Sequence, residues 1–381
     1  MNDIYQQSLK IHQTLSGKIS LKSKIPIKTK KDLSLAYTPG VSAVCKKITC
    51  NKNNSYQYTS RSNLVAVISD GSAVLGLGNI GPEAAMPVME GKAILFKKFA
   101  NIDAFPICIN TQDTDEIVNF IKLIEPTFGG INLEDISAPR CFIIEEKLKK
   151  TLNIPVFHDD QHGTAIVTLA ALINAAKVAK KNIKNLSIVI SGAGSAGIAI
   201  AKLLLFYGIK QIVLTDSKGI IYPGRSHLNS SKKKIAILTN PYKITGNLKN
   251  SLQKADVFIG VSQGKILKPE MVKNMNKNPI IFAMANPIPE INPTLAKKAG
   301  ALIVGTGRSD FPNQINNVLA FPGIFRGLLD AKIKKTTPQM FISAAEGIAN
   351  CLKNPTLQKI IPSVLDKNVV KAVAKAVQKH K

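Results

Sequence analysis

Apolar residues follow two different patterns along the first part of the chain. Short apolar runs rich in β-branched residues are typical of buried strands, whereas the longer stretches between them repeat their apolar residues at helical spacing. We expect strands at residues 64–70, 104–110, 129–136 and 154–160, and helices at residues 113–125 and 139–152. This alternation predicts parallel β-α-β units.

The second part of the chain opens with a helical stretch at residues 163–181 and then alternates in the same way. Further strands are expected at residues 186–191, 211–216, 256–262, 279–285 and 301–307, and the pattern is helical from residue 312 to the end. We therefore predict an α/β protein of two domains, residues 1–160 and residues 161–381. The second is expected to be a Rossmann-type dinucleotide-binding domain with a helical C-terminal tail.

The pattern Gly-x-Gly-x-x-Gly occurs twice, and its second copy has the context of a dinucleotide-binding turn. It lies between a strand and a helix, and the next strand ends in Asp216, where a carboxylate can bond ribose hydroxyls. Gly192 permits the tight turn, Gly194 lets the backbone approach the pyrophosphate, and Gly197 lets the helix pack on the strand. The coenzyme is therefore expected on Gly192, Ala193, Gly194, Ser195, Ala196 and Gly197.

The first copy, at residues 76–81, lacks this context. Residues 71–75 separate it from the preceding strand, Pro82 follows it directly, and Pro87 is expected to interrupt the next helix. The sequence therefore predicts either a turn that serves another site or a tight packing turn.

The composition is that of an ordinary globular protein, with 45% hydrophobic residues in 381 and five scattered cysteines without a Cys-x-x-Cys pair. Because no signal peptide and no long apolar run is recognised, neither secretion nor membrane spanning is expected. The scattered cysteines fit a reducing cytoplasm and do not suggest a zinc site. The formal net charge of +27 raises the possibility of nucleic-acid binding. Nearly all of the 51 basic residues are dispersed lysines, however, and tryptophan is absent, so neither specific nucleic-acid binding nor membrane binding is expected.

Acidic residues end two of the strands predicted in the first domain. Glu134 and Asp135 end one strand and Asp160 ends another, and the carboxyl ends of parallel strands share one edge of a sheet. Three carboxylates without a histidine or cysteine pattern favour Mg²⁺ or Mn²⁺ over zinc. His158 and His162 are alternative ligands, although their spacing suits a shared ion poorly, and the carboxylates could also be helix caps or solvated charges.

A series of motifs resembles the compact bacterial malic enzymes from about residue 20 to the end of the chain. In order they are YTPGV (37–41), SDGSAVLGLGNIG (69–81), MEGKAILFKKFANIDAFPI (89–107), NLEDI (132–136), HDDQHGTA (158–165), GAGSAG (192–197), ANPIPEI (285–291) and GTGRSDFPNQINNVLAFPGIFRG (305–327). The resemblance implies oxidative decarboxylation of malate to pyruvate and CO₂ with reduction of NADP⁺ or NAD⁺. It also implies that the first glycine turn belongs to an N-terminal substrate and metal domain and shapes the cleft near a catalytic lysine.

The resemblance also implies roles for individual residues. Lys92 resembles the general base that takes the proton from the malate C2 hydroxyl, and we expect burial to lower its pKa. Tyr37 resembles the acid that protonates the enol at C3. Glu134, Asp135 and Asp160 resemble the ligands of Mg²⁺ or Mn²⁺, which would chelate malate and stabilise the enolate.

Asparagines of the second domain complete the residues that the resemblance implies. Asn286 and Asn317 resemble side chains that orient malate and the nicotinamide, with Asn316 as an adjacent alternative to Asn317. The competing hypotheses are another two-domain NAD(P)-dependent hydroxy- or amino-acid dehydrogenase and, less favoured, a basic nucleic-acid-binding protein.

The chain departs from larger members of the family at Ala73, where they carry an arginine for the substrate carboxylate. Lys97 and Lys98 are the candidate replacements, from the same or a second subunit, and a homodimer or higher homo-oligomer is expected. The appended acetyltransferase-like domain of some longer members is not expected here.

The coenzyme is left open between NADP and NAD by the residues at the adenosine end of the site. Asp216 favours NAD through ribose hydrogen bonds, whereas Ser217, Lys218 and Arg225 could neutralise a 2′-phosphate. We favour NADP, with NAD as the alternative.

Overall fold

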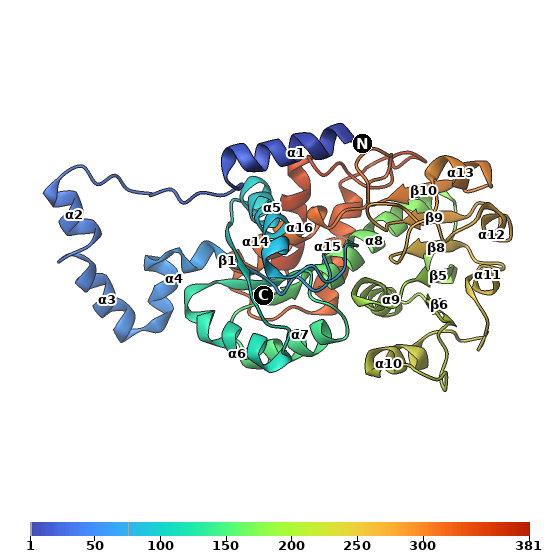
Figure 1. Ribbon diagram of the computed structural model, residues 1–381, viewed down its shortest axis with the longest axis horizontal. Helices are drawn as coiled ribbons and strands as arrows, with labels where there is room; N and C mark the ends of the chain where they lie inside the picture. The colour runs from blue at the N-terminus through green and yellow to red at the C-terminus, as the bar shows by residue number, and fades with distance from the viewer. Residues whose placement is uncertain (1, 75) are drawn as a thin grey trace.

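The chain forms two separate, mostly parallel β-sheets with helices packed around them (Figure 1). The computed structural model describes residues 2–74 and 76–381, so Met1 and Leu75, which lies within the predicted 71–75 segment, are outside the description. The expected α/β class is confirmed, and each strand that the sequence predicts is present.

The first sheet has the strand order β2-β1-β3-β4, and all its neighbouring strands run parallel. Its strands are β1 (Leu64–Ser69), β2 (Asp103–Cys108), β3 (Gly130–Leu133) and β4 (Val156–His158), and its helices are α5 (Pro82–Ala100), α6 (Thr114–Ile124) and α7 (Arg140–Thr151). Val67 belongs to the core on the α5 side, whereas the next residue, Ile68, packs with α6 and α7. Because both faces are covered, the strands are apolar along their whole length.

The second sheet has the order β10-β9-β8-β5-β6-β7. Its strands are β5 (Ser187–Ser191), β6 (Gln211–Asp216), β7 (Gly219–Ile220), β8 (Val257–Gly260), β9 (Ile280–Ala283) and β10 (Ile303–Thr306); its helices are α9 (Ser195–Tyr207), α10 (Ser230–Leu238), α11 (Leu248–Ser251), α12 (Pro269–Lys273) and α13 (Pro293–Lys298). The parallel order turns at β5, which lies between β6 and β8, as expected of a Rossmann-type domain. The short β7, which pairs antiparallel with β6, is an addition that the sequence pattern does not predict.

A long buried helix, α8 (Asp159–Val178), connects the two sheets. It begins directly after β4, before residue 163 where the sequence predicts it, and so places two acidic residues in its first turn. Most of its residues are buried because helices pack around it on several sides. The acidic end of α8 is therefore rigidly placed at the carboxyl edge of the first sheet.

The helical end predicted for the chain is confirmed, with an interruption. It contains α14 (Phe321–Ala331), α15 (Pro338–Asn350) and α16 (Lys367–Gln378), and residues 351–366 form turns between the last two helices. Phe321 at the start of α14 lies edge-on to Phe96 of α5, with ring centroids 4.7 Å apart. The C-terminal helices thus pack on the first sheet's helix as well as on α8, in one shared core.

Helix α5 is continuous from Pro82 to Ala100, so the expected interruption at Pro87 is wrong. Pro82 occupies the first turn, where a backbone N–H has no helical partner, and Pro87 lies one turn further in. The side chain of Lys18 donates to the Pro87 carbonyl at 2.6 Å, and Phe96 anchors the later turns in the core. Packing over the rest of the helix therefore outweighs the local loss of a hydrogen bond.

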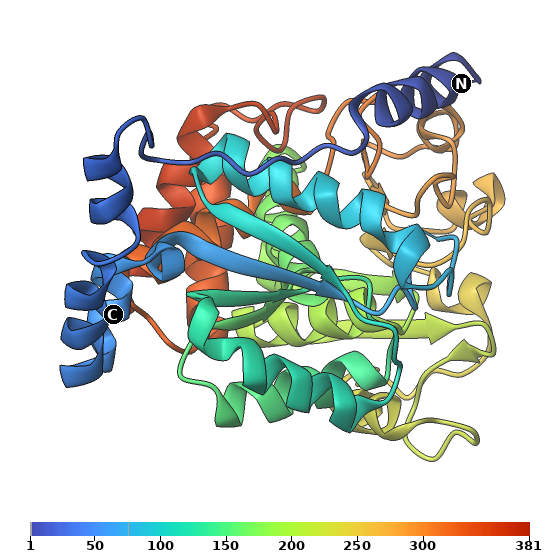
Figure 2. The same ribbon diagram turned by 60° about the vertical axis from the view of Figure 1, so that its left-hand side comes forward.

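The N-terminal helices are arranged differently from the rest of the molecule. They are α1 (Asn2–Leu15), α2 (Lys30–Ala36), α3 (Val41–Cys50) and α4 (Ser55–Tyr58). Figures 1 and 2 show α2 and α3 projecting from the body at the end of an extended segment, and neither helix has a buried residue. We call residues 19–50 the N-terminal arm. Among the described residues, no helix is long and apolar enough to cross a membrane.

Candidate active site

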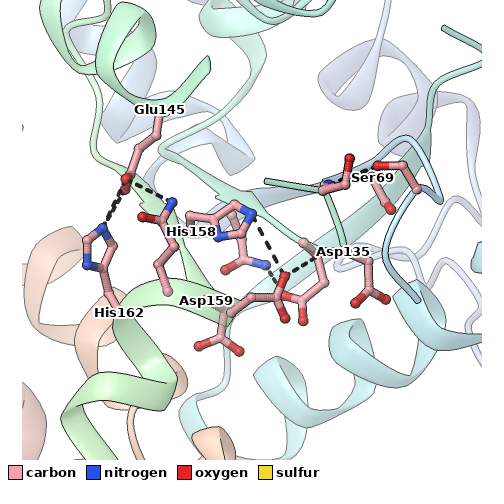
Figure 3. Close-up of polar contacts among 12 residues, drawn as sticks. Ser69, Asp135, Glu145, His158, Asp159 and His162 are labelled. Atoms are coloured by element: carbon pink, nitrogen blue, oxygen red, sulfur yellow. Dashed lines mark hydrogen bonds and ion pairs between the residues drawn. The ribbon is translucent and has the colours of Figure 1, made fainter. Parts of the chain in front are cut away.

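A cluster of carboxylates lies at the carboxyl ends of β3 and β4. Glu134 and Asp135 follow β3, and Asp159 and Asp160 form the first turn of α8 after β4 (Figure 3). Glu134, Asp135 and Asp160 each offer an oxygen within 4.8 Å of the others, so the structure brings the three predicted ligands together. The parallel topology, which aligns strand ends, produces this convergence.

The cluster carries more negative charge than the protein itself neutralises. Asp135, in a left-handed backbone conformation with φ of 53°, donates its N–H to Asp160 Oδ2 at 2.8 Å. Its own Oδ2 is buried and has no hydrogen-bond partner among the described residues. Burial, followed by the neighbouring charges of Asp160 and Glu134, raises the pKa of Asp135 to about 9. Three converging carboxylates that repel one another, one of them with an oxygen that has no donor, fit a divalent cation such as Mg²⁺ or Mn²⁺.

The two histidines weighed as alternative ligands play different parts. His158 is buried with its Nε2 3.8 Å from Asp160 Oδ2, too far for a hydrogen bond, and burial lowers its pKa. His162 turns the other way, and its Nε2 lies 2.8 Å from an oxygen of Glu145 (Figure 3). His162 is therefore held by Glu145, apart from the carboxylate cluster.

Lys92, on α5, reaches into the same cluster. Its Nζ lies 2.6 Å from Asp159 Oδ2 and 2.8 Å from Glu134 Oε1, and the residue is 7% exposed. Burial lowers the pKa of Lys92, but the two carboxylates outweigh burial and raise the pKa above its ordinary value. The sequence-based expectation of a lowered pKa is therefore wrong for this arrangement, because it considered burial without the partners.

Asp159 is the residue of the site that sequence reasoning missed. It is fully buried, and burial together with the charge of Glu134 raises its pKa to about 8 despite the nearby lysine. A Cβ at Gly163 would lie 1.9 Å from Asp159 Oδ1, so the glycine one helical turn later makes room for the carboxylate. That glycine, in HDDQHGTA, was the available sequence signal.

One of the predicted asparagines, Asn317, reaches the cluster from the second domain. Asn317 Nδ2 donates to Asp159 Oδ2 at 2.5 Å, whereas the side chain of Asn316 caps the following helical turn by accepting from Val318 N. Asn286 lies exposed in the loop after β9. A Cβ at Gly76 would lie 2.5 Å from the Asn286 carbonyl oxygen, so the first glycine turn packs against this loop.

The second glycine turn has the shape of a pyrophosphate cradle. Gly192 has φ of 113°, and a Cβ there would lie 2.6 Å from the Val261 carbonyl oxygen. A Cβ at Gly197 would lie 1.7 Å from the Gly192 oxygen, whereas a Cβ at Gly194 would meet nothing within 4 Å. Two glycines therefore serve close packing and the third faces open space in front of the N-terminus of α9, which fits a bound coenzyme.

Of the remaining positions singled out in the sequence, Tyr37 and Lys97 lie away from the cluster, whereas Ala73 lies beside it. Tyr37 ends α2 on the N-terminal arm and is 67% exposed, so the structure does not bring it to Lys92 within one chain. Lys97 pairs with Asp103 at the start of β2, which is the opposite edge of the sheet from the cluster. Ala73 lies beside the cluster, with its N–H donated to the Asp135 carbonyl at 3.0 Å.

Comparison with known proteins agrees with this geometry. Residues 16–149 match the family described as "Malic enzyme, N-terminal domain", and residues 161–381 match "Malic enzyme, NAD binding domain". The chain is 58% identical to the "Bifunctional malic/malolactic enzyme" of Bacillus subtilis (strain 168), over 98% of this chain and 92% of that one. It is 54% identical to the "NAD-dependent malic enzyme" of Geobacillus stearothermophilus, over 95% and 76% of the two chains.

Two further proteins are similar to this chain over most of its length. The "NADP-dependent malic enzyme" of Escherichia coli (strain K12) is 50% identical over 91% of this chain, which spans 46% of that protein. Among solved structures, the NAD-dependent malic enzyme of Thermotoga maritima superimposes with a TM-score of 0.94 at 51% identity, over 97% and 98% of the two chains.

Proposed function

The chain belongs to the malic enzyme family, and we therefore propose that it oxidises and decarboxylates malate to pyruvate and CO₂ while reducing NADP⁺ or NAD⁺. The observation that carries the proposal is the buried cluster of Lys92 with four carboxylates, in a chain whose second domain also forms a pyrophosphate cradle. A plain hydroxy-acid dehydrogenase has no need of three convergent carboxylates. Residues 1–160 supply the substrate and metal side, and residues 161–381 supply the coenzyme side.

Glu134, Asp135 and Asp160 are the proposed ligands of Mg²⁺ or Mn²⁺. When bound, the metal supplies a Lewis acid for the malate oxygens and for the negative charge that develops on loss of CO₂. Asn132 Nδ2 donates to Glu134 Oε2 at 2.8 Å, and the Asp135 N–H donates to Asp160. These bonds orient two of the three ligands before any ion binds.

Lys92 and Asp159 act in this proposal as a coupled proton-transfer pair. The raised pKa of Lys92 keeps it protonated beside the two carboxylates, so it must pass a proton to a neighbour before it can accept one from the malate C2 hydroxyl. Asp159, whose Oδ2 accepts from Nζ at 2.6 Å, is that neighbour, and it takes the proton in its ionised form. Asn317, donating to the same oxygen, holds Asp159 in place.

Tyr37 is proposed to reach the active site of a second copy of the chain. The N-terminal arm carries it away from its own cluster, and the arm also exposes Leu21, Ile27 and Leu35 to solvent. Apolar side chains on a projecting segment require a covering partner, and a symmetric dimer would place each arm against the other subunit. A homodimer thereby completes both sites with a proton donor for the enol.

The first experiment is to assay malate with NADP⁺ and with NAD⁺ in the presence of Mn²⁺, and to measure pyruvate and CO₂. Pyruvate in stoichiometric amounts with reduced coenzyme supports the proposal, and its absence with both coenzymes refutes it. Lactate should be measured in parallel, because the Bacillus subtilis relative is named a malic/malolactic enzyme.

The same preparation tests the competing hypotheses. Oxidation of another hydroxy acid or an amino acid without CO₂ release would favour a simple dehydrogenase. Sub-micromolar, sequence-dependent binding of nucleic acid at physiological salt would revive the nucleic-acid interpretation, whereas weak, steeply salt-dependent binding would reflect only the net charge of +27.

A further inference from the structure

We propose that Glu145 of α7 is a positioning residue of the active site, which fixes the first turn of α8 and thereby aims Asp159 and Asp160 into the carboxylate cluster. The inference rests on the proposed function, because it takes Asp160 as a metal ligand. It gives a role to Gln161 and His162, the polar residues that follow Asp160 in HDDQHGTA and that the proposed mechanism does not use.

The first turn of α8 presents its polar side chains on two opposite sides. Successive residues of a helix are turned by about 100°, so residues 159 and 160 face one side of the turn and residues 161 and 162 face the other. The contacts follow this geometry, because the two aspartates bond within the carboxylate cluster, whereas Gln161 and His162 bond to Glu145 on the far side (Figure 3). Whatever holds the second pair therefore sets the direction of the first.

Glu145 is 6% exposed, and its carboxylate is surrounded by donors. His162 Nε2 lies 2.8 Å from Oε1 and 3.0 Å from Oε2, Gln161 Nε2 donates to Oε2 at 3.3 Å, and Lys149 Nζ lies 2.8 Å from Oε1. Burial alone would raise the pKa of Glu145, but His162 and Lys149 outweigh burial and hold the pKa well below its ordinary value. The carboxylate is therefore ionised at neutral pH. Because an ionised carboxylate only accepts hydrogen bonds, it orients both donors of α8.

The ring of His162 is also held between two aromatic side chains. Its centroid lies 5.5 Å from that of Phe157 in β4 and 4.6 Å from that of Phe341 in α15. Packing therefore fixes the ring, and the charge of Glu145 fixes the direction of its hydrogen bond. The N-cap residue, His158, makes no side-chain hydrogen bond to the first turn in the described part of the chain. The anchor of this turn is thus Glu145, from the side that faces away from the cluster.

Such an anchor matters because a metal site tolerates only small rotations of the helix that carries a ligand. Side-chain tips lie about 5–6 Å from a helix axis, so a rotation of the turn by about 10° would move a carboxylate by about 1 Å. Metal–ligand distances vary by only about 0.2 Å. The carboxylates of the cluster repel one another, and this repulsion would turn Asp160 away from Glu134 and Asp135 if the opposite side of the turn were free. An ionised Glu145 resists that rotation before any metal or substrate binds.

The test is direct binding of Mn²⁺ to the full-length protein, without malate or coenzyme, measured from the electron paramagnetic resonance signal of the free ion. Glu145→Gln keeps the size of the side chain but replaces one acceptor with an amide donor that faces the N–H groups of Gln161 and His162. It should raise the Kd for Mn²⁺ about 10- to 100-fold, the usual effect of removing a residue that orients a metal ligand, and lower kcat with malate. Glu146→Gln is the matched control, because Glu146 lies next along α7 but is exposed and pairs with Lys150.

Variants of His162 separate positioning from a general loss of structure. His162→Gln keeps a donor for Glu145 and should bind Mn²⁺ within about threefold of wild type, whereas His162→Leu removes the donor and should resemble Glu145→Gln. The double variant of Glu145→Gln with His162→Leu should bind Mn²⁺ within about twofold of the weaker single variant, because both residues act through one contact. NADH binding by equilibrium dialysis should change less than about threefold in all of them, since the coenzyme turn lies in the other domain.

Wild-type Mn²⁺ affinity in Glu145→Gln, an equal loss in Glu146→Gln, or equal losses of Mn²⁺ and NADH binding in Glu145→Gln would each overturn the proposal. Losses that multiply in the double variant would overturn it as well. Wild-type protein that binds Mn²⁺, loses this binding in Glu145→Gln, and releases no pyruvate with either coenzyme would instead refute the proposed function and leave the role of Glu145 standing.

Discussion

Two inactive variants of this protein should restore activity to one another, because the proposed site combines Lys92 of one chain with Tyr37 of the other. In a mixed dimer of Tyr37→Phe and Lys92→Ala, one site would contain both substitutions and the other site neither. Random assembly of equal amounts gives about half mixed dimers, so the mixture should recover about a quarter of the wild-type activity per site. If both residues served the same chain's site, each site in every dimer would carry one defect.

The exposed apolar side chains of the N-terminal arm indicate how firmly such a dimer would hold. They are Leu21, Ile25, Ile27, Leu33, Leu35 and Tyr37, and their exposed fractions run from 49% to 90%. Burying a side chain of this kind contributes about 1.5–3 kcal/mol, so after scaling by exposure one arm contributes roughly 8 kcal/mol and a symmetric pair roughly 16 kcal/mol. The cost of association is estimated at about 4–15 kcal/mol. The arms can therefore supply most of the free energy of dimerisation.

The complementation assay requires that subunits exchange or assemble together. Co-expression with two different affinity tags, followed by sequential purification, isolates the mixed dimer, whose activity should approach about half of the wild-type value because one of its two sites is intact. Each variant purified alone provides the control. Mixed dimers as inactive as the parent variants would refute the exchange of Tyr37, as would a wild-type protein that sediments as a fully active monomer.

Four substitutions, assayed one at a time, separate the parts of the site. Tyr37→Phe should slow malate decarboxylation more than the reduction of added oxaloacetate, whereas Lys92→Ala should impair both reactions. Normal oxaloacetate reduction by Lys92→Ala would refute the role of Lys92 as the general base. Asp160→Ala, like strong chelation, should abolish malate turnover and leave coenzyme binding, measured by equilibrium dialysis, within about threefold of wild type. Unchanged turnover under chelation would contradict the metal site. Gly197→Ala should weaken binding of both coenzymes and lower the melting temperature, because the new Cβ would lie 1.7 Å from the Gly192 oxygen; wild-type binding and stability would contradict the close packing.

The sequence predicts the fold well because its strongest signals are local. Each expected strand is a short apolar run, and the Gly192–Gly197 turn follows one of them directly. The errors occur where distant packing decides the local structure. Pro87 remains within a helix because the core holds that helix on both sides of the proline, and α8 begins at Asp159 because β4 ends beside it.

The carboxylate ligands could also be predicted, since parallel strands bring their carboxyl ends to one edge. The sequence pattern does not show which of the adjacent residues Asp159 and Asp160 faces Asp135 and which faces Lys92. Adjacent residues in the first turn of a helix point about 100° apart, so one of the pair turns toward Asp135 and the other toward Lys92. Which residue turns toward which partner depends on where α5 crosses the sheet, and a pattern of apolar residues does not contain that information.

The protonation state of Lys92 depends on the same long-range arrangement. Burial considered alone predicts a lowered pKa, but the chain buries Lys92 with Glu134 and Asp159, which are remote in sequence. With all four carboxylates ionised and Lys92 protonated, the formal charge of the site would be about −3, and a bound divalent cation would reduce it to about −1. A metal ion at Glu134 would also draw that carboxylate's charge away from Lys92. The metal ligands and the base are thus electrostatically one unit, and a change in either should alter the pH at which the other works.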